Sequence, residues 1–289
     1  MFKKAFSIAS KFTLPVIVSN RFFDGRVESG VASFILLNKD GWILTASHVV
    51  SSLLKAQDDL KALQEYRNKL DAISKDISLD SKAKRKRSNK IIPNKDWITN
   101  NSFWWACNSF RVEKYVGNNM ADIAIGQIIN FIEAPGQIYP KFLKSTENLI
   151  GESVCRIGFP FHNVSTTFDQ QSSKFILANN TLPIPIFIND GVIARYNMII
   201  GPDNSNAKYI ETTTPGLRGQ SGGPIINTNG EIVAMQVRTT HYALGFNPEV
   251  DLNGKKSIEP QFLNTGNGLS SENILQFLAE NNVDVEIVQ

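Results

Sequence analysis

A serine enclosed by glycines, in Gly219–Pro224 (Gly-Gln-Ser-Gly-Gly-Pro), constrains this chain more than any other feature. Glycines on both sides of Ser221 remove Cβ atoms, so another carbonyl group can approach the main chain closely. Such a loop can present the serine hydroxyl and the backbone N–H groups of Gly219 and Ser221 on one side. Two N–H groups aimed at one point form an oxyanion hole, which stabilises a tetrahedral intermediate. The alternative is a glycine-rich hairpin turn without chemistry.

Two upstream residues favour the chemical interpretation. His48 and Asp122 each lie at the end of a β-like apolar run. The chain order His, Asp, Ser is one of the known orders for a serine triad. In such a triad Ser221 is the nucleophile, His48 takes up and returns its proton, and Asp122 orients the imidazole and stabilises its charged form. The alternatives are a core histidine and an ordinary carboxylate at a strand end.

Four stretches together resemble the trypsin-like serine proteases, and most closely their high-temperature-requirement (HtrA) branch of bacterial and organellar enzymes. They are Gly30–Val50, Ala121–Ile125, Gly151–Pro160 and Gly219–Met235. This resemblance implies an all-β fold of two six-stranded antiparallel β-barrels. It also implies a serine endopeptidase that cleaves proteins or peptides through an acyl-enzyme intermediate, without a cofactor. The main alternative is a catalytically silent protease fold that serves as a binding or scaffold module. A serine esterase is a third reading, but its Gly-x-Ser-x-Gly elbow belongs to a different fold.

The chain divides around an insertion. His48 and Asp122 are 74 residues apart, whereas the same gap in chymotrypsin is about 45. We therefore expect residues 1–50 and 98–140 to form the first barrel and residues 51–97 to be inserted into it. Residues 141–289 are expected to form the second barrel and a C-terminal helix that begins after a serine cap. The residues that follow this helix are too few for an appended peptide-binding domain.

The insertion has two parts. From Ser51 to about Leu79, apolar residues recur at steps of three, four or seven, which predicts an amphipathic helix roughly 40 Å long. Its apolar stripe either packs on the barrel or a second helix, or forms a partner surface or short coiled coil. Residues Ser81–Lys90 then carry six basic residues and no acidic one.

This basic segment is interpreted either as a solvated, disordered loop or as a binding site at Lys82–Lys90. Its ligand there would be an acidic protein, nucleic acid or anionic lipid, and an import signal is a further reading. Nucleic acid is disfavoured because no aromatic residue interleaves the basic ones for base stacking. A regulatory partner of the whole 51–97 insertion is the functional hypothesis, because the insertion starts close to His48.

The resemblance also indicates the substrate-binding residues. Thr214, Pro215 and Gly216 precede the nucleophile, and Gln236 lies on the strand that forms one wall of the primary specificity pocket in the family. No Asp is placed to receive a basic side chain, and Gln236 stands where glutamyl endopeptidases carry a histidine. The sequence thus predicts an uncharged pocket for a small or medium apolar side chain.

Gln220 and Arg218 depart from secreted trypsins. In those enzymes an Asp precedes the nucleophile and pairs with the N-terminus that activation cleavage creates. A neutral Gln220 cannot form that ion pair, so the protein is not expected to be made as a zymogen. Arg218 is interpreted as binding an acidic substrate or as holding the loop inactive. His162 and His241 match no catalytic motif and are expected on the surface or in loops.

Cysteine content bears on the compartment. The 289 residues carry a net charge of only +3 and just two cysteines, Cys107 and Cys155. Secreted relatives are usually rich in disulfides, so free thiols and a cytoplasmic location are favoured over secretion or the periplasm, with one disulfide as the alternative. The segment Met1–Lys11 imitates a signal peptide only weakly, because Lys11 breaks its apolar stretch and Leu14–Val18 reads as a strand.

Two further classes of site are not expected. No stretch approaches the ~18–20 apolar residues of a membrane span. No metal site is predicted, because the three histidines have no ligand spacing and the two cysteines are far apart in sequence.

Overall fold

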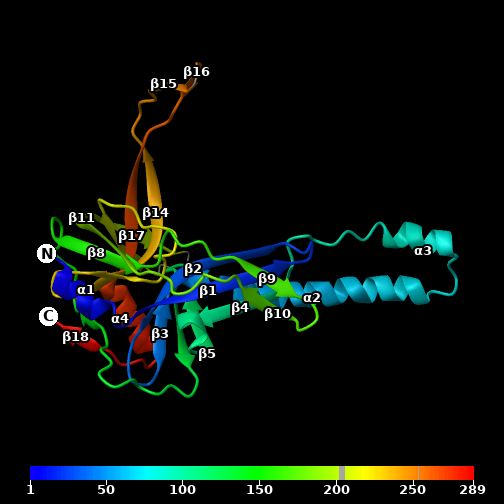
Figure 1. Cartoon of the computed structure of the whole chain (residues 1–289), viewed down its shortest axis with the longest axis horizontal. Helices are drawn as coiled ribbons and strands as arrows, with labels where there is room; N and C mark the ends of the chain where they lie inside the picture. Colours follow the sequence, from blue (N-terminus) through cyan, green and yellow to red (C-terminus); the bar gives the residue numbers. More distant parts are fainter. Residues whose placement is uncertain (202–205, 253) are drawn as a thin grey trace.

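Two β-sheets, one from each half of the chain, carry the fold (Figure 1). The computed structural model describes residues 1–201, 206–252 and 254–289. The first sheet is antiparallel and six-stranded, in the order β4-β1-β2-β3-β6-β5. Its strands are β1 (Thr13–Phe22), β2 (Val27–Leu36), β3 (Trp42–Thr45), β4 (Ile98–Trp105), β5 (Val112–Asn118) and β6 (Ile123–Ile128).

The central strands of the first sheet coincide with short apolar runs. In β2 the last five residues, Ala32–Leu36, are all buried, as expected for a strand covered on both faces. A turn at Asn38–Gly41 follows β2: Gly41 has φ +75° and its N–H donates to the Asn38 carbonyl at 3.2 Å. The chain then returns as β3, which ends at Thr45, three residues before His48.

The second sheet has eight strands in the order β13-β8-β11-β12-β17-β14-β7-β18, two more than the predicted barrel. The difference arises because β7 and β18 add parallel pairings at the edge next to β14. The strands are β7 (Lys141–Leu143), β8 (Ser153–Gly158), β11 (Phe187–Ile200), β12 (Asn206–Thr212), β13 (Pro224–Ile226), β14 (Ile232–Ala243), β17 (Phe262–Ser270) and β18 (Glu286–Val288). The predicted two-barrel, mostly β architecture is confirmed.

Two small hairpins were not expected from the sequence. One, β9 (Thr166–Asp169) with β10 (Lys174–Leu177), lies in the chain between β8 and β11. The other, β15 (Glu249–Leu252) with β16 (Lys255–Ile258), caps a ribbon that β14 and β17 extend away from the body (Figure 1).

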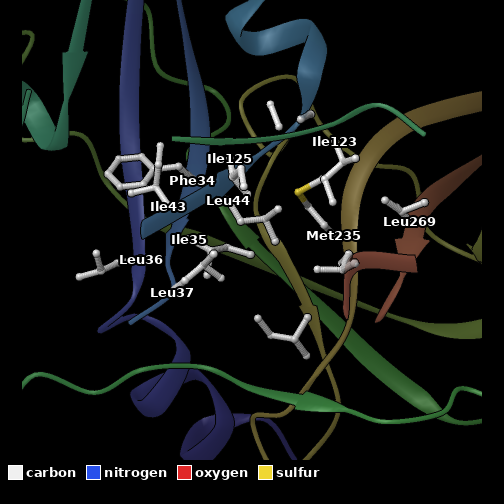
Figure 2. Close-up of a cluster of buried hydrophobic side chains, with 14 of the residues drawn as sticks. Phe34, Ile35, Leu36, Leu37, Ile43, Leu44, Ile123, Ile125, Met235 and Leu269 are labelled. Carbon is white, nitrogen blue, oxygen red and sulfur yellow. The ribbon is translucent and has the colours of Figure 1, made fainter. Parts of the chain in front are cut away.

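Both sheets bury side chains in one continuous core (Figure 2). Phe34, Leu44 and Ile123 enter it from the first sheet, and Met235 and Leu269 enter it from the second. The loops at the junction of the two sheets are therefore held from both sides. The candidate site residues lie in these loops.

Helices at the two ends of the chain pack on this core. The helix α1 (Lys3–Ala9) was not predicted; Ala5 and Ala9 are fully buried, and Ala5 lies against the turn at Gly230. The predicted C-terminal helix is confirmed as α4 (Ser271–Glu280), with the Ser270 side chain accepting the Asn273 N–H as its cap. None of the helices in the described ranges combines the length and the hydropathy needed to cross a bilayer.

The insertion forms an arm that extends from the sheets (Figure 1). Its long helix α2 (Ser47–Lys75) begins at Ser47 and not at Ser51 as predicted, so His48 belongs to its first turn. Near its root α2 packs against β4, and Ala56 and Leu63 are buried. The predicted stripe is packed only in part, since Leu60 is exposed, Leu70 is half-buried and Ile77, beyond the end of α2, is fully exposed.

The basic segment is a helix, α3 (Ser81–Ser88), where a disordered loop was one of the two readings. Asp80 caps it, because its Oδ1 accepts the Ala83 N–H at 2.7 Å. Lysine, arginine and alanine are good helix formers, which explains why the segment is helical once it is capped. Lys84 Nζ reaches the Ser74 carbonyl at 2.6 Å, so α3 folds back on α2.

Candidate active site

His48 and Asp122 meet where two paired strands end. Thr45 in β3 pairs with Ala124 in β6, and His48 and Asp122 lie just beyond these partners. The Asp122 carboxylate lies against His48 through both oxygens: Oδ2 is 2.8 Å from the ring Nδ1, and Oδ1 accepts the His48 backbone N–H at 2.9 Å. The imidazole is therefore oriented with its Nε2 available for another group.

The loop before Asp122 is shaped to present its carboxylate. Asp122 has φ +53°, in the left-handed region that Asp tolerates better than most residues. Asn118 Oδ1 accepts the N–H groups of Met120 and Ala121 at 3.0 and 3.1 Å. These bonds fix the turn that leads from β5 into β6.

The serine loop is held between the two sheets. Ser33 of β2 donates its N–H to the Ser221 carbonyl at 2.9 Å and its Oγ to the Gly219 carbonyl at 2.8 Å. On the other side, the Gly222 N–H donates to the carbonyl of Gln236 in β14 at 2.9 Å. The first sheet, which carries His48 and Asp122, thereby fixes the position of the loop from the second half of the chain.

Gly219 adopts a conformation that other residues would resist. Its φ is +104°, and a Cβ atom built on it would lie 2.4 Å from the Phe159 carbonyl oxygen. Within the described part of the chain, the N–H groups of Gly219 and Ser221 donate to no protein acceptor. Both amides remain available to an oxygen atom of a substrate, as the sequence predicts for an oxyanion hole.

His48, Gly219 and Ser221 line one cleft of about 400 Å³. Arg218 and Asn20 also contribute to its wall. The His48 side chain is 48% exposed, so a substrate can reach it. Among the described residues, no hydrogen bond joins Ser221 to His48. Bonds of this kind are often long without substrate and shorten when it binds.

A neutral amide pair supports the serine loop from behind. Gln220 is fully buried; its Nε2 donates to Asn189 Oδ1 at 2.6 Å and its Oε1 accepts the Leu217 N–H at 2.9 Å. Asn189 in turn donates to the Pro215 carbonyl at 3.2 Å. The loop is thus braced by hydrogen bonds without an ion pair at this position.

The predicted substrate-binding residues surround a side chain that sequence reasoning missed. Arg156, on β8, donates from Nε to Gln236 Oε1 at 2.6 Å and from Nη1 to Thr214 Oγ1 at 2.8 Å. The Gln236 amide fills the space beside Gly216, where a Cβ would lie 2.0 Å from its Nε2. The available signal was a lone charged residue inside the apolar strand Val154–Ile157.

The remaining histidines lie outside this cleft. His162, in a loop, bonds through Nε2 to the Thr181 carbonyl at 2.6 Å and lines a neighbouring cavity. His241, exposed on the β14–β17 ribbon, bonds through Nδ1 to Asn264 Oδ1 at 2.6 Å. Both placements agree with the prediction of surface or loop histidines. Across residues 1–201, 206–252 and 254–289, no three His, Cys, Asp or Glu side chains gather as metal ligands.

Comparison with known proteins gives one family and one fold. The model of the trypsin-like peptidase domain matches residues 30–235 of this chain. The structure of the Rv3671c protease from M. tuberculosis in its active form superposes with a TM-score of 0.50 at 11% identity, covering 98% of this chain and 86% of that chain. At this identity the likeness concerns the fold alone. No curated protein matches the sequence.

Two further solved structures are similar at the same level. The HtrA-type protease AlgW, solved with a tripeptide, gives a TM-score of 0.48 at 12% identity and covers 97% of this chain. This chain covers 63% of that protein, so it spans less than two thirds of its length. The inactive form of Rv3671c gives 0.45 at 13% identity, covering 96% of this chain and 91% of that chain.

Proposed function

Because this chain belongs to the trypsin-like peptidase family, we propose that it is a serine endopeptidase whose triad is His48, Asp122 and Ser221. One observation carries the assignment: the Asp122 carboxylate holds the His48 ring at 2.8 Å in the cleft that Ser221 also lines. A histidine oriented by a carboxylate next to a serine is the arrangement that activates a hydroxyl nucleophile.

Each step of the reaction has a residue. Ser221 Oγ attacks the scissile carbonyl carbon while His48 Nε2 takes the hydroxyl proton, and the N–H groups of Gly219 and Ser221 bind the resulting oxyanion. The intermediate collapses when His48 returns that proton to the leaving amine, which leaves an ester on Ser221. Water, activated by the same histidine, then hydrolyses the ester. Asp122 stabilises the imidazolium in both halves of the reaction.

Activation by cleavage is not part of this proposal. Gln220 is buried and bonded to the neutral Asn189 side chain, so its position offers no carboxylate to a newly formed ammonium group. An N-terminally extended protein is therefore expected to turn over peptides as fast as the chain without the extension. A requirement for removal of the extension would contradict this part of the proposal.

The arm supports a regulatory role. His48 lies in the first turn of α2, so any partner that tilts the arm also acts on the histidine. The exposed basic residues Lys82, Arg85, Lys86 and Lys90 at its far end suit an acidic protein partner.

A location in the cytoplasm is part of the same proposal, supported by Cys107 and Cys155 both being free thiols. Fractionation of cells that produce the protein tests the location.

The decisive test of the triad is covalent labelling with a fluorophosphonate probe, which reports an activated serine without reference to a peptide sequence. Wild type is expected to label and Ser221→Ala is not. Ser29→Ala is the matched control, because Ser29 lines the same cleft and carries no step of the proposed reaction. Folded wild type that never labels would leave the catalytically silent scaffold as the better reading.

A further inference from the structure

Arg156 is a buried cation whose partners are all neutral. Its side chain is 1% exposed, and its acceptors are the Gln236 amide and the Thr214 hydroxyl. Its Nη2 is buried and has no partner, and within the described residues no Asp or Glu oxygen forms an ion pair with it. Burial lowers the pKa of Arg156 to about 10, with the neighbouring Cys155 opposing the shift, so the group is still charged at neutral pH.

Such an arrangement is costly unless something compensates it. A buried charge without an opposite charge loses its hydration and gains too little from neutral hydrogen bonds. Folded proteins normally pair a charged side chain with an opposite charge or leave it exposed to solvent. The uncompensated guanidinium therefore indicates an anionic ligand that comes from outside the chain.

The position of Arg156 in the fold indicates which molecule would supply that anionic ligand. Gln236, its acceptor, exchanges backbone hydrogen bonds with Gly222 and Gly223, the residues next to Ser221. Thr214, its second acceptor, begins the segment that leads into the serine loop. Arg156 thus lies between the strand and the segment that the sequence predicts to bind the substrate side chain.

Missing side chains make room for the guanidinium at this point. A Cβ on Gly266 of β17 would lie 2.2 Å from Arg156 Nη2, and a Cβ on Gly216 would lie 2.0 Å from the Gln236 amide. Nε and Nη2 form one edge of the guanidinium. Gln236 Oε1 occupies the Nε end of this edge, and the buried Nη2 end has no hydrogen-bond partner among the described residues. A carboxylate fits both ends with two parallel hydrogen bonds, which a single amide oxygen cannot do.

We propose that Arg156 selects an acidic residue, glutamate or aspartate, immediately before the bond that Ser221 attacks. The carboxylate of that residue replaces Gln236 Oε1 on Nε and pairs with Nη2, and the Gln236 amide turns aside from the space next to Gly216. This inference rests on the proposed function, because it assigns the substrate of the same cleft. It replaces the uncharged pocket that was predicted from the residues near Ser221 alone.

The test compares peptides that differ only in the residue before the scissile bond: Glu, Gln, Leu or Arg. Wild type is expected to cleave the Glu peptide with a kcat/KM about 100-fold above that of the isosteric Gln peptide, the range of a charge-assisted pair. Arg156→Met is expected to lose this preference while it still labels with the fluorophosphonate probe. Arg111→Met, which changes an exposed arginine that does not line the cleft, should retain this preference.

The outcomes separate the two proposals. Wild type that labels but cleaves Gln or Leu peptides as well as Glu peptides overturns the inference and leaves the peptidase assignment intact. Wild type that does not label contradicts the proposed function, and the inference falls with it. If Arg218→Met removes the Glu preference and Arg156→Met keeps it, the Arg218 guanidinium that lines the cleft is responsible and the inference is wrong.

A second measurement needs no variant, in case Arg156→Met does not fold. Wild type digests a denatured mixture of proteins, and mass spectrometry locates the cut sites. Cuts concentrated after Glu and Asp support the inference, and cuts after apolar residues or without preference overturn it. The Glu-over-Gln ratio is also expected to shrink as the pH falls through about 4.3, where a free Glu side chain becomes neutral.

Discussion

Asp122 contacts His48 twice, through Oδ2 to the ring nitrogen and through Oδ1 to the backbone N–H that begins helix α2. One carboxylate therefore orients the imidazole and anchors the helix that carries it. A substitution that keeps one acceptor oxygen and removes the other distinguishes the effects of these two hydrogen bonds.

Asp122→Asn and Asp122→Ala are expected to differ in stability but not in catalysis. Asn keeps an oxygen for the His48 N–H, so its melting temperature should stay close to wild type. The Ala variant loses that acceptor, and its free energy of unfolding should be lower by about 1–3 kcal/mol. Both should lose about 10⁴-fold in kcat, because the imidazole is no longer held in the working tautomer. Turnover of Asp122→Asn near the wild-type value would remove Asp122 from the triad.

Gly219→Ala is expected to lower kcat by about 10²–10³-fold, the effect of losing one oxyanion donor. The added Cβ meets the Phe159 carbonyl at 2.4 Å, so the peptide that carries the Gly219 N–H must turn away. Gly25→Ala is the matched control, since Gly25 has a similar φ of +89° and nothing near its Cβ position. Equal losses of kcat in both variants would mean that backbone strain alone explains the effect.

Four exposed charges of the basic segment, three on α3 and Lys90 just beyond it, are expected to affect the cleavage of protein targets only. Lys82, Arg85, Lys86 and Lys90 replaced by Gln keep the helix propensity and spare Lys84 and Arg87, which hold α3 to α2. Small-peptide hydrolysis should be unchanged, and cleavage of an acidic protein target should slow and lose its salt dependence. If both rates match wild type, the helix is only a solvated end of the arm.

Tyr66→Ala is expected to loosen the arm. Tyr66 packs edge-on against Phe23 and Trp97, with ring centroids 5.8 and 5.9 Å away, and so ties α2 to the end of the β1–β2 hairpin. Each aromatic pair contributes about 0.5–1.5 kcal/mol beyond its burial. Hydrogen exchange should accelerate in the outer half of α2, while Lys61→Ala, at an exposed site, should leave it unchanged.

The two thiols are expected to differ in reactivity. Burial raises the pKa of Cys155 to about 12 and also raises the pKa of Cys107, which is less buried. A raised pKa lowers the fraction of thiolate, the reactive form, at pH 8. An alkylating reagent should therefore modify Cys107 slowly and Cys155 only after unfolding. Rapid labelling of Cys155 in the folded protein would contradict its burial.

Much of the first sheet and the serine loop was predictable because their constraints are local. The Asn38–Gly41 turn needs a positive φ that glycine supplies, and the serine loop needs glycine at Gly219 and Gly222 for the same reason. Apolar runs also mark the central strands β2 and β3, whereas β4 contains the polar stretch 99–102. That His48 lies beside Asp122 followed from the chain order of a known triad and not from any local pattern.

The features that were missed depend on partners distant in sequence. In the sequence, Arg156 is a lone charged residue in an apolar strand. Only the fold brings Gln236 and Thr214 to it as hydrogen-bond acceptors. The helix α2 begins before Ser51 because Asp122 accepts the His48 N–H, a bond between residues 74 positions apart. The helical state of Ser81–Ser88 depends on the N-cap at Asp80. The basic composition of the segment gives no indication of this cap.

The shared core has a consequence for how the molecule loses its structure. Phe34 and Leu44 of one sheet and Met235 and Leu269 of the other belong to one cluster (Figure 2), so opening either sheet exposes the side chains of the other that pack in this cluster. Melting of the body should be a single cooperative transition, in which cleft and fold disappear at the same temperature. The outer part of the arm, from which this core is absent, should melt separately and earlier.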